Sequence, residues 1–272
     1  MADEKEAVLA TIQKFLNSIS SRQPPFSEAL EHVLPDGWCV LSHPDEFWVG
    51  RFKDLVPRIE EKVTKTFGDL ASKFEERLAE PGPEVWIHED LAAVWAGYQV
   101  VFDNKEITRG INAFGLHKTA DGWKISGVAD TQLPEGPEQS PILQTVSPEV
   151  MKPIDYLLDN MTEGNWDKIP SVFVTGSGIT NSRRKDNMLF TSTWDELLVR
   201  LKGIIDKSPS EIRELLFDVE ARICGDFAFA WTPFVIDING QTVSKGVNIF
   251  TLVRKEGEWI ISGAQDTSMP VQ

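Results

Sequence analysis

Histidine, the side chain best suited to proton transfer near neutral pH, is confined to one half of this sequence. All four histidines, His32, His43, His88 and His117, lie in the first half of the 272 residues. Acid–base chemistry that depends on histidine is therefore expected in that half, and we name His43 and His117 as candidate catalytic residues. The alternative for each histidine is an ordinary surface or structural role.

The second half of the chain repeats the first. The stretch GWKISGVADTQLP, which begins at Gly122, returns as EWIISGAQDTSMP from Glu258, 136 residues later. The match extends without a gap over the region from Asp90 to Pro134, which indicates a tandem duplication. A residue that differs between the two copies is not required by the fold that they share.

Three polar residues of the first copy join the candidates. Tyr98 aligns with Phe234, so the fold does not require its hydroxyl, and we name it as catalytic. Asp130 follows at the end of the last predicted strand, where desolvation could make it a general base, but it could also cap the strand end. Asn112 could donate a hydrogen bond to a ligand carbonyl, or it could be a structural amide, because the second copy keeps an asparagine there.

Aromatic residues supply the remaining candidate ligand contacts. We name Trp38, Trp95 and Phe114 for this role, together with Asn112. Trp95 also recurs in the second copy as Trp231. Each indole buries a large apolar area, so packing in the core is the alternative for the tryptophans.

The sequence carries no pattern typical of a metal or a cofactor site. His88 and Asp90 would share one face of a strand, but two ligands do not make a metal site. No glycine-rich phosphate loop of the GxGxxG or GxxxxGK type occurs, nor a G-x-S-x-G elbow. Cys39 and Cys224 are too few for a disulfide framework or a zinc cluster. We therefore predict no metal, no cofactor and reduced thiols.

Composition excludes two classes of partner. The net charge of −15 is not interrupted by a basic stripe, so nucleic acid is not an expected partner. No apolar run approaches the roughly 20 residues of a membrane span, and the opening MADEKEAVLA has acids where a signal peptide would have lysines. We expect a cytoplasmic protein that does not bind membranes.

Each copy is predicted to place helices before strands. Apolar residues three and four apart indicate helices at 8–19, 29–34 and 52–67, and at 148–163, 169–173 and 194–205 in the second copy. Short strands are expected at 38–42 and 178–182. From Val85 onward the pattern is that of an antiparallel meander, with Asn239 and Gly240 as a type I′ hairpin turn in the second copy. Helices that precede an antiparallel sheet favour an α+β fold.

The pattern W-x-x-Y…R-G-I-N-x-F-x-L…D-G-W-K-I…D-T, which begins at Trp95, resembles the NTF2-like superfamily, in particular its SnoaL-like branch. The second copy reads W-T-P-F…K-G-V-N-I-F-T-L…E-W-I-I…D-T and is similar. The resemblance implies two cone-shaped α+β domains, each with N-terminal helices on a curved, mostly antiparallel sheet. We place them at residues 1–134 and 147–272, with a proline-rich linker at 135–146.

The same resemblance implies a conical pocket for a small apolar molecule. Related proteins include ketosteroid isomerases, polyketide cyclases and dehydratases that use no cofactor, and also binding modules without chemistry. One hypothesis is therefore a cofactor-free isomerase, cyclase or dehydratase acting on a small carbonyl compound in the first domain, where the loop after the first strand would bring His43 to the pocket mouth. The alternatives are a non-catalytic carrier and a protein-interaction scaffold.

NTF2-like domains commonly pair through their sheets, and a two-fold interface uses the same patch on both partners. Joining two copies by a linker raises the effective concentration of each for the other. We therefore predict a monomeric chain that forms an internal pseudo-dimer.

Overall fold

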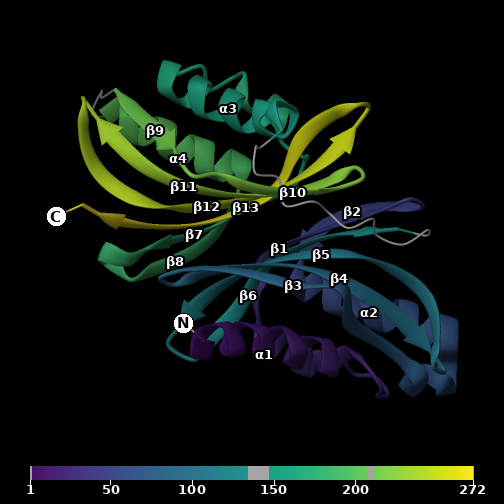
Figure 1. Cartoon of the computed structure of the whole chain (residues 1–272). Coiled ribbons are helices and arrows are strands. Elements are labelled where there is room, and N and C mark those ends of the chain that lie inside the picture. Colours follow the sequence, from purple (N-terminus) through teal and green to yellow (C-terminus); the bar gives the residue numbers. More distant parts are fainter. Residues whose placement is uncertain (1, 134–146, 208–210, 272) are drawn as a thin grey trace. The chain divides into compact units, whose positions relative to one another are not determined.

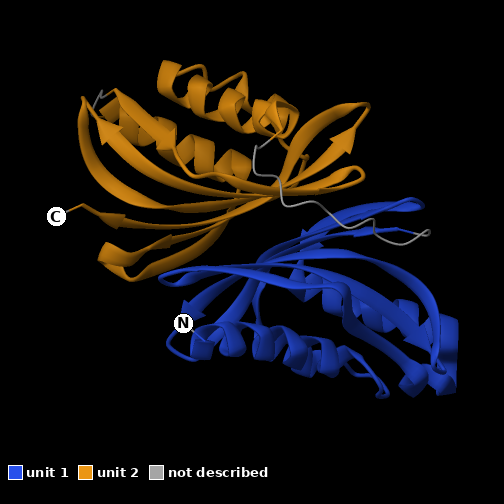
Figure 2. Ribbon diagram, viewed as in Figure 1, with its two compact units in different colours: residues 1–139 blue, residues 140–272 orange. Residues whose placement is uncertain are grey.

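The computed structural model describes residues 2–133, 147–207 and 211–271 (Figure 1). The chain divides into two compact units, residues 1–139 and 140–272, which we call unit 1 and unit 2 (Figure 2). The linker predicted at residues 135–146 lies outside the described residues. The domain boundaries and the internal pseudo-dimer therefore stay predictions. Among the described residues, no helix has both the length and the apolar character that crossing a bilayer demands.

Unit 1 packs two α-helices on one face of a six-stranded sheet (Figure 1). The sheet has the order β2-β1-β6-β5-β4-β3, and every neighbouring pair is antiparallel except β1 and β6. Its elements are α1 (Ala2–Ile19), η1 (Ser27–His32), β1 (Val33–His43), β2 (Glu46–Arg51), α2 (Phe52–Phe67), η2 (Gly68–Lys73), β3 (Phe74–His88), β4 (Leu91–Phe102), β5 (Lys105–Thr119) and β6 (Gly122–Gln132).

Unit 2 repeats this arrangement. Its sheet has the order β10-β11-β12-β13-β7-β8, with β9 also paired to β11, and β7 is the strand that runs parallel to its neighbour β13. Its elements are α3 (Pro148–Glu163), η3 (Ile169–Val172), β7 (Gly178–Arg183), η4 (Arg184–Asp186), β8 (Met188–Thr193), α4 (Trp194–Lys207), β9 (Ile212–Leu216), β10 (Glu220–Cys224), β11 (Phe227–Ile238), β12 (Gln241–Lys255) and β13 (Glu258–Pro270).

The helices are held by the apolar stripe that the sequence predicts. In α1 this stripe is Val8, Ile12, Phe15, Leu16 and Ile19, all of them buried. Helix α1 packs against β3 and β6, whereas α2 packs against β1, and Phe15 meets Phe52 edge to face at a centroid distance of 5.8 Å. Two helices thus cover one face of a mostly antiparallel sheet, which confirms the predicted α+β class.

Proline explains two departures from the predicted elements. The helix predicted at 29–34 ends at His32, because Pro35 forces the preceding Leu34 out of the helical region, and β1 begins at Val33. The sheet starts at Phe74 rather than Val85, and its register with β4 shifts between Ala79 and Glu84, where the sequence reads EPGP. A proline donates no backbone hydrogen bond, so a strand cannot pair continuously through this stretch.

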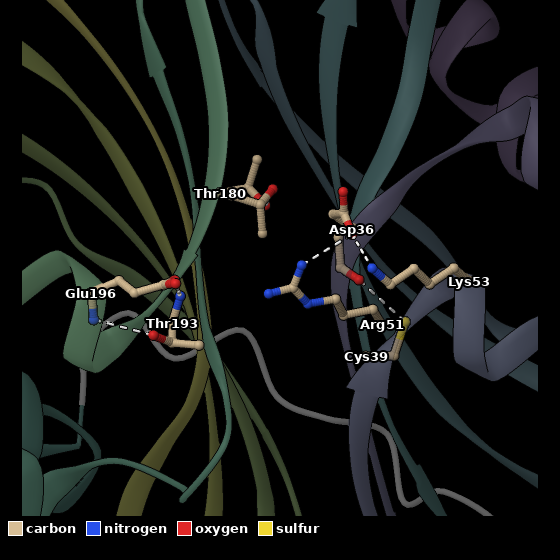
Figure 3. A network of polar contacts seen from close by, with 9 residues as sticks. Asp36, Cys39, Arg51, Lys53, Thr180, Thr193 and Glu196 are labelled. Atoms are coloured by element: carbon tan, nitrogen blue, oxygen red, sulfur yellow. Dashed lines mark hydrogen bonds and ion pairs between the residues drawn. The ribbon is translucent and has the colours of Figure 1, made fainter.

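Local polar contacts fix the helix starts and the turns. Thr193 and Glu196 form a capping box at the start of α4: Glu196 N–H donates to Thr193 Oγ1 at 3.1 Å, and Thr193 N–H donates to Glu196 Oε2 at 2.8 Å (Figure 3). In unit 1, Arg51 and Lys53 at the start of α2 both donate to Asp36 (Figure 3). Asn239 and Gly240 have φ angles of 52° and 78°, which confirms the predicted type I′ turn.

Gly110 of β5 occupies a position where a side chain has no room. An added Cβ would lie 1.9 Å from the Thr131 carbonyl oxygen and 2.7 Å from Tyr98 Cε1. We expect Gly110→Ala to lower the free energy of unfolding by about 1–3 kcal/mol, because neither strand can move aside freely. The control is Gly82→Ala, where no atom lies within 4 Å. Urea unfolding of the full chain measures both variants, and equal midpoints would contradict this explanation.

Candidate functional site

Unit 1 encloses a cavity of ≈ 260 Å³ between its helices and the covered face of its sheet. Most of the wall is apolar and comes from α1, α2 and the strands. The polar part includes His43, Glu76, Tyr98, Asn112, Asp130 and Gln132. An apolar wall with a few convergent polar groups is the usual form of a small-molecule site.

Three of the predicted catalytic residues meet in this cavity. His43 Nε2 lies 2.8 Å from Asp130 Oδ2, and the Tyr98 hydroxyl donates to the same oxygen at 3.2 Å. The side chains of His43 and Asp130 are each 10% exposed. With Nε2 directed at a carboxylate, Nδ1 is the nitrogen through which His43 can accept a proton.

Sheet register explains why these residues meet. Strand β1 runs parallel to β6 with Leu41 opposite Asp130, so His43, two residues further on, shares the face of Leu41. Tyr98 reaches Asp130 from β4, which is two strands away. It can do so because Gly110, its partner on the intervening strand β5, has no side chain to block the ring.

Burial determines the protonation of the tyrosine. Burial raises the pKa of Tyr98, and the negative charge of Asp130 raises it further. The phenol therefore keeps its proton at neutral pH, and it acts here as a hydrogen-bond donor to Asp130.

A second carboxyl, Glu76 of β3, lines the same cavity. Glu76 as a whole is partly exposed, but its carboxyl group is surrounded by protein atoms. Desolvation of this carboxyl, together with the negative charge of Asp130, raises the pKa of Glu76 to about 7. The side-chain amide of Asn112 lies near the Glu76 carboxyl and acts to lower this pKa. Asn112 Nδ2 makes no hydrogen bond of ordinary geometry to the described residues. Asn112 and Glu76 are therefore two potential donors beside the cavity.

Unit 2 builds the same frame with different partners. Asn248 is paired with Asp266 on the neighbouring strand, as Asn112 is paired with Asp130 in unit 1. Asn248 Nδ2 donates a hydrogen bond to Glu214 Oε1 at 2.6 Å. Burial raises the pKa of Glu214 to about 7 as well.

Two positions differ between the frames. Arg183 takes the place of His43, and its Nη1 donates to Asp266 Oδ1 at 2.7 Å. Phe234, which lies opposite Gly246 as Tyr98 lies opposite Gly110, has no hydroxyl. Unit 2 therefore keeps the aspartate and the glutamate but lacks the histidine and the tyrosine hydroxyl of unit 1.

The remaining predicted residues divide by the face of the sheet. Phe114 and Asn112 line the cavity. Trp38, Trp95 and His117 do not, because they alternate with cavity-facing residues and point to the opposite face. His117 is fully buried there with Nδ1 2.7 Å from Ser126 Oγ, and the Arg51 guanidinium lies 4.8 Å above the Trp38 ring.

Sequence reasoning missed Glu76, Glu214 and Arg183. A signal for Arg183 was present, since the predicted strands at 38–42 and 178–182 end one residue before His43 and Arg183. The two glutamates stand in FEERL and IRELL, where loops of unequal length change the offset between the copies. Among the described residues, no group of three or more His, Cys, Asp or Glu side chains is arranged to hold a metal ion.

No family model and no curated protein matches the chain. Solved structures do resemble part of it. A protein of unknown function with a cystatin-like fold from Nostoc punctiforme PCC 73102 is 14% identical, and the match covers 50% of this chain and 95% of that one at a TM-score of 0.40. An NTF2-like protein with a cystatin-like fold from Novosphingobium aromaticivorans is 15% identical. That match covers 50% of this chain and 85% of the other chain, and its TM-score is 0.40. The protein ActVI-ORFA from Streptomyces coelicolor is 12% identical. That match covers 44% of this chain and 95% of the other chain, and its TM-score is 0.38. Each of these matches covers about half of this chain, and none bears on the role of any residue.

Proposed function

We propose that unit 1 is a cofactor-independent acid–base catalyst for a small, mostly apolar carbonyl compound, of the isomerase, cyclase or dehydratase class. The observation that carries the proposal is the pair of contacts that His43 and Tyr98 make with Asp130 at the wall of the cavity. A histidine whose ring is oriented by a buried carboxylate is the usual form of a general base.

The proton balance of such a reaction needs no co-reactant. His43 Nδ1 takes a proton from the carbon next to the carbonyl, and Asp130 stabilises the imidazolium that forms. The electron pair of the broken C–H bond forms a carbon–carbon double bond, and the π pair of the carbonyl moves onto its oxygen to give an enolate. The imidazolium then returns the proton to another atom of the same molecule, either a carbon or a departing hydroxyl, which leaves as water.

The negative charge that develops on the carbonyl oxygen needs donors. Asn112 Nδ2 has no hydrogen-bond partner among the described residues, and the Glu76 carboxyl lies near it. Glu76 donates a hydrogen bond only when protonated. These two groups are the proposed oxyanion donors, which in enzymes act most strongly where water is excluded.

The alternatives receive unequal support. The apolar wall of the cavity equally suits a carrier that binds without chemistry. The scaffold hypothesis expects cavities filled by tryptophan and phenylalanine, but Trp38 and Trp95 lie outside the cavity of unit 1. The hypothesis of a scaffold for protein contact is therefore the least supported of the three.

The matched variants His43→Gln and Arg183→Gln test the assignment to unit 1. We expect the full chain to accelerate the exchange of deuterium from D₂O into the carbon next to the carbonyl of small cyclic ketones, followed by NMR. The change His43→Gln should reduce this rate by about 10²–10⁴-fold, because the general base is lost. The change Arg183→Gln should leave the rate within about twofold. Equal losses in both variants would contradict the assignment, and ketone binding without exchange would favour the carrier.

The glutamate of the site predicts a pH dependence of stability. The folded-state pKa of Glu76, about 7, lies above its ordinary value of 4.5, so the folded protein binds more protons than the unfolded chain between these values. The stability due to Glu76 is complete below about pH 4.5 and is lost as the pH rises through about 7. Glutamine does not titrate, so the free energy of unfolding of Glu76→Gln, relative to that of the wild type, should rise by on the order of 1–3 kcal/mol from pH 4.5 to pH 8.

The control for this experiment is Glu75→Gln, the preceding residue, whose side chain is 39% exposed. Urea unfolding across the pH range measures all three chains. A difference between Glu76→Gln and wild type that does not change with pH would show that the Glu76 carboxyl is not desolvated.

A further inference from the structure

The cavity between the helices and the sheet of unit 2 has a volume of ≈ 380 Å³, compared with ≈ 260 Å³ for the matching cavity of unit 1. Its wall includes Trp194 of α4 and Phe173, whose rings stack at a centroid distance of 4.0 Å and an angle of 3°. Aliphatic side chains of α3 and α4 complete the apolar part. The site therefore offers flat, apolar surfaces to an occupant.

The polar end of this cavity holds one fixed cation beside one fixed anion. Arg183 donates to Asp266 Oδ1 at 2.7 Å, and both line the cavity. Burial acts to lower the pKa of the Arg183 guanidinium, but the charge and hydrogen bond of Asp266 outweigh it and raise that pKa. The pair is neutral as a whole, so it does not favour a charged ligand.

Asn181 adds a hydrogen-bond donor that no described residue uses. It occupies the position of Leu41 in unit 1, opposite the aspartate on the neighbouring strand, and it is 1% exposed. Arg183 Nη2 donates to Asn181 Oδ1 at 2.9 Å, which fixes the orientation of the amide. Asn181 Nδ2 is then buried without a partner among the described residues, at the wall of the cavity.

A buried donor without a partner is costly, and a bound acceptor removes that cost. We propose that unit 2 is a binding site for an uncharged, flat, apolar molecule that carries a ketone-type oxygen, and that this oxygen accepts a hydrogen bond from Asn181 Nδ2. Arg183 and Phe234 stand where unit 1 has His43 and Tyr98, so this site lacks the base proposed for unit 1 and binds the molecule as a ligand. This inference does not depend on catalysis in unit 1.

A pair of probes that differ in one group tests the proposal. The ketone probe is 6-propionyl-2-dimethylaminonaphthalene, and its control is 6-propyl-2-dimethylaminonaphthalene, which has a CH₂ group in place of the carbonyl. Binding to the full chain is followed through the ¹⁵N-indole NMR signal of Trp194, which lines the cavity of unit 2 and so reports on that site alone. We expect both probes to shift this signal, and the ketone to bind about tenfold more tightly.

The variant Asn181→Leu restores the residue that unit 1 has at this position. It should weaken binding of the ketone by about tenfold and leave binding of the control probe without the carbonyl unchanged or stronger. The comparison of the two probes on the wild-type chain remains decisive if the variant does not fold. Equal affinities of the two probes, equal weakening of both by Asn181→Leu, or no shift of the Trp194 signal would each overturn the proposal.

Discussion

Each unit is organised around an aspartate near the end of its last strand that must be paired within an apolar cavity. A carboxylate that loses water there is costly unless a cation or strong donors compensate it. In unit 1 the compensation comes from His43 and Tyr98, and in unit 2 it comes from Arg183. In both units the partner of the aspartate, His43 or Arg183, comes from the strand that runs parallel to the last strand, so the pairings of β1 with β6 and of β7 with β13 position the site.

The duplicated frame separates what the fold needs from what a site adds. Both units keep the asparagine, the glutamate and the aspartate at matching register positions. Both also keep a glycine, Gly110 or Gly246, that lets an aromatic ring lie across the sheet. Three differences lie next to the aspartate, where His43, Tyr98 and Leu41 of unit 1 correspond to Arg183, Phe234 and Asn181 of unit 2. These exchanges remove proton carriers from unit 2 and add a donor.

The fold could be predicted to a large extent because its signals are local. The helix at 52–67 follows from apolar spacing, and the start of α3 follows from Ser147 and Pro148. The short strands β2 and β8 were not predicted, since six residues beside a helix carry little periodicity. The candidate site was predicted only in part. Side chains alternate between the two faces of a strand, so Tyr98 and Trp95 point to opposite faces of the sheet. The sequence alone does not show which of these faces the helices cover, and therefore does not show which residue faces the cavity.

The neutral acid beside each carboxylate completes the comparison of the two units. Desolvation of the carboxyl raises the pKa of Glu76 and of Glu214, and the negative charge of Asp130 or Asp266 in the same cavity raises it further. Each cavity therefore holds one carboxylate and one acid that is largely protonated below pH 7. In unit 1 the partner of the carboxylate is a histidine, whose second ring nitrogen is a candidate proton acceptor. In unit 2 the partner is an arginine, whose guanidinium only donates hydrogen bonds. The same arrangement of strands thus places a candidate base beside the carboxylate in one cavity and a fixed cation in the other.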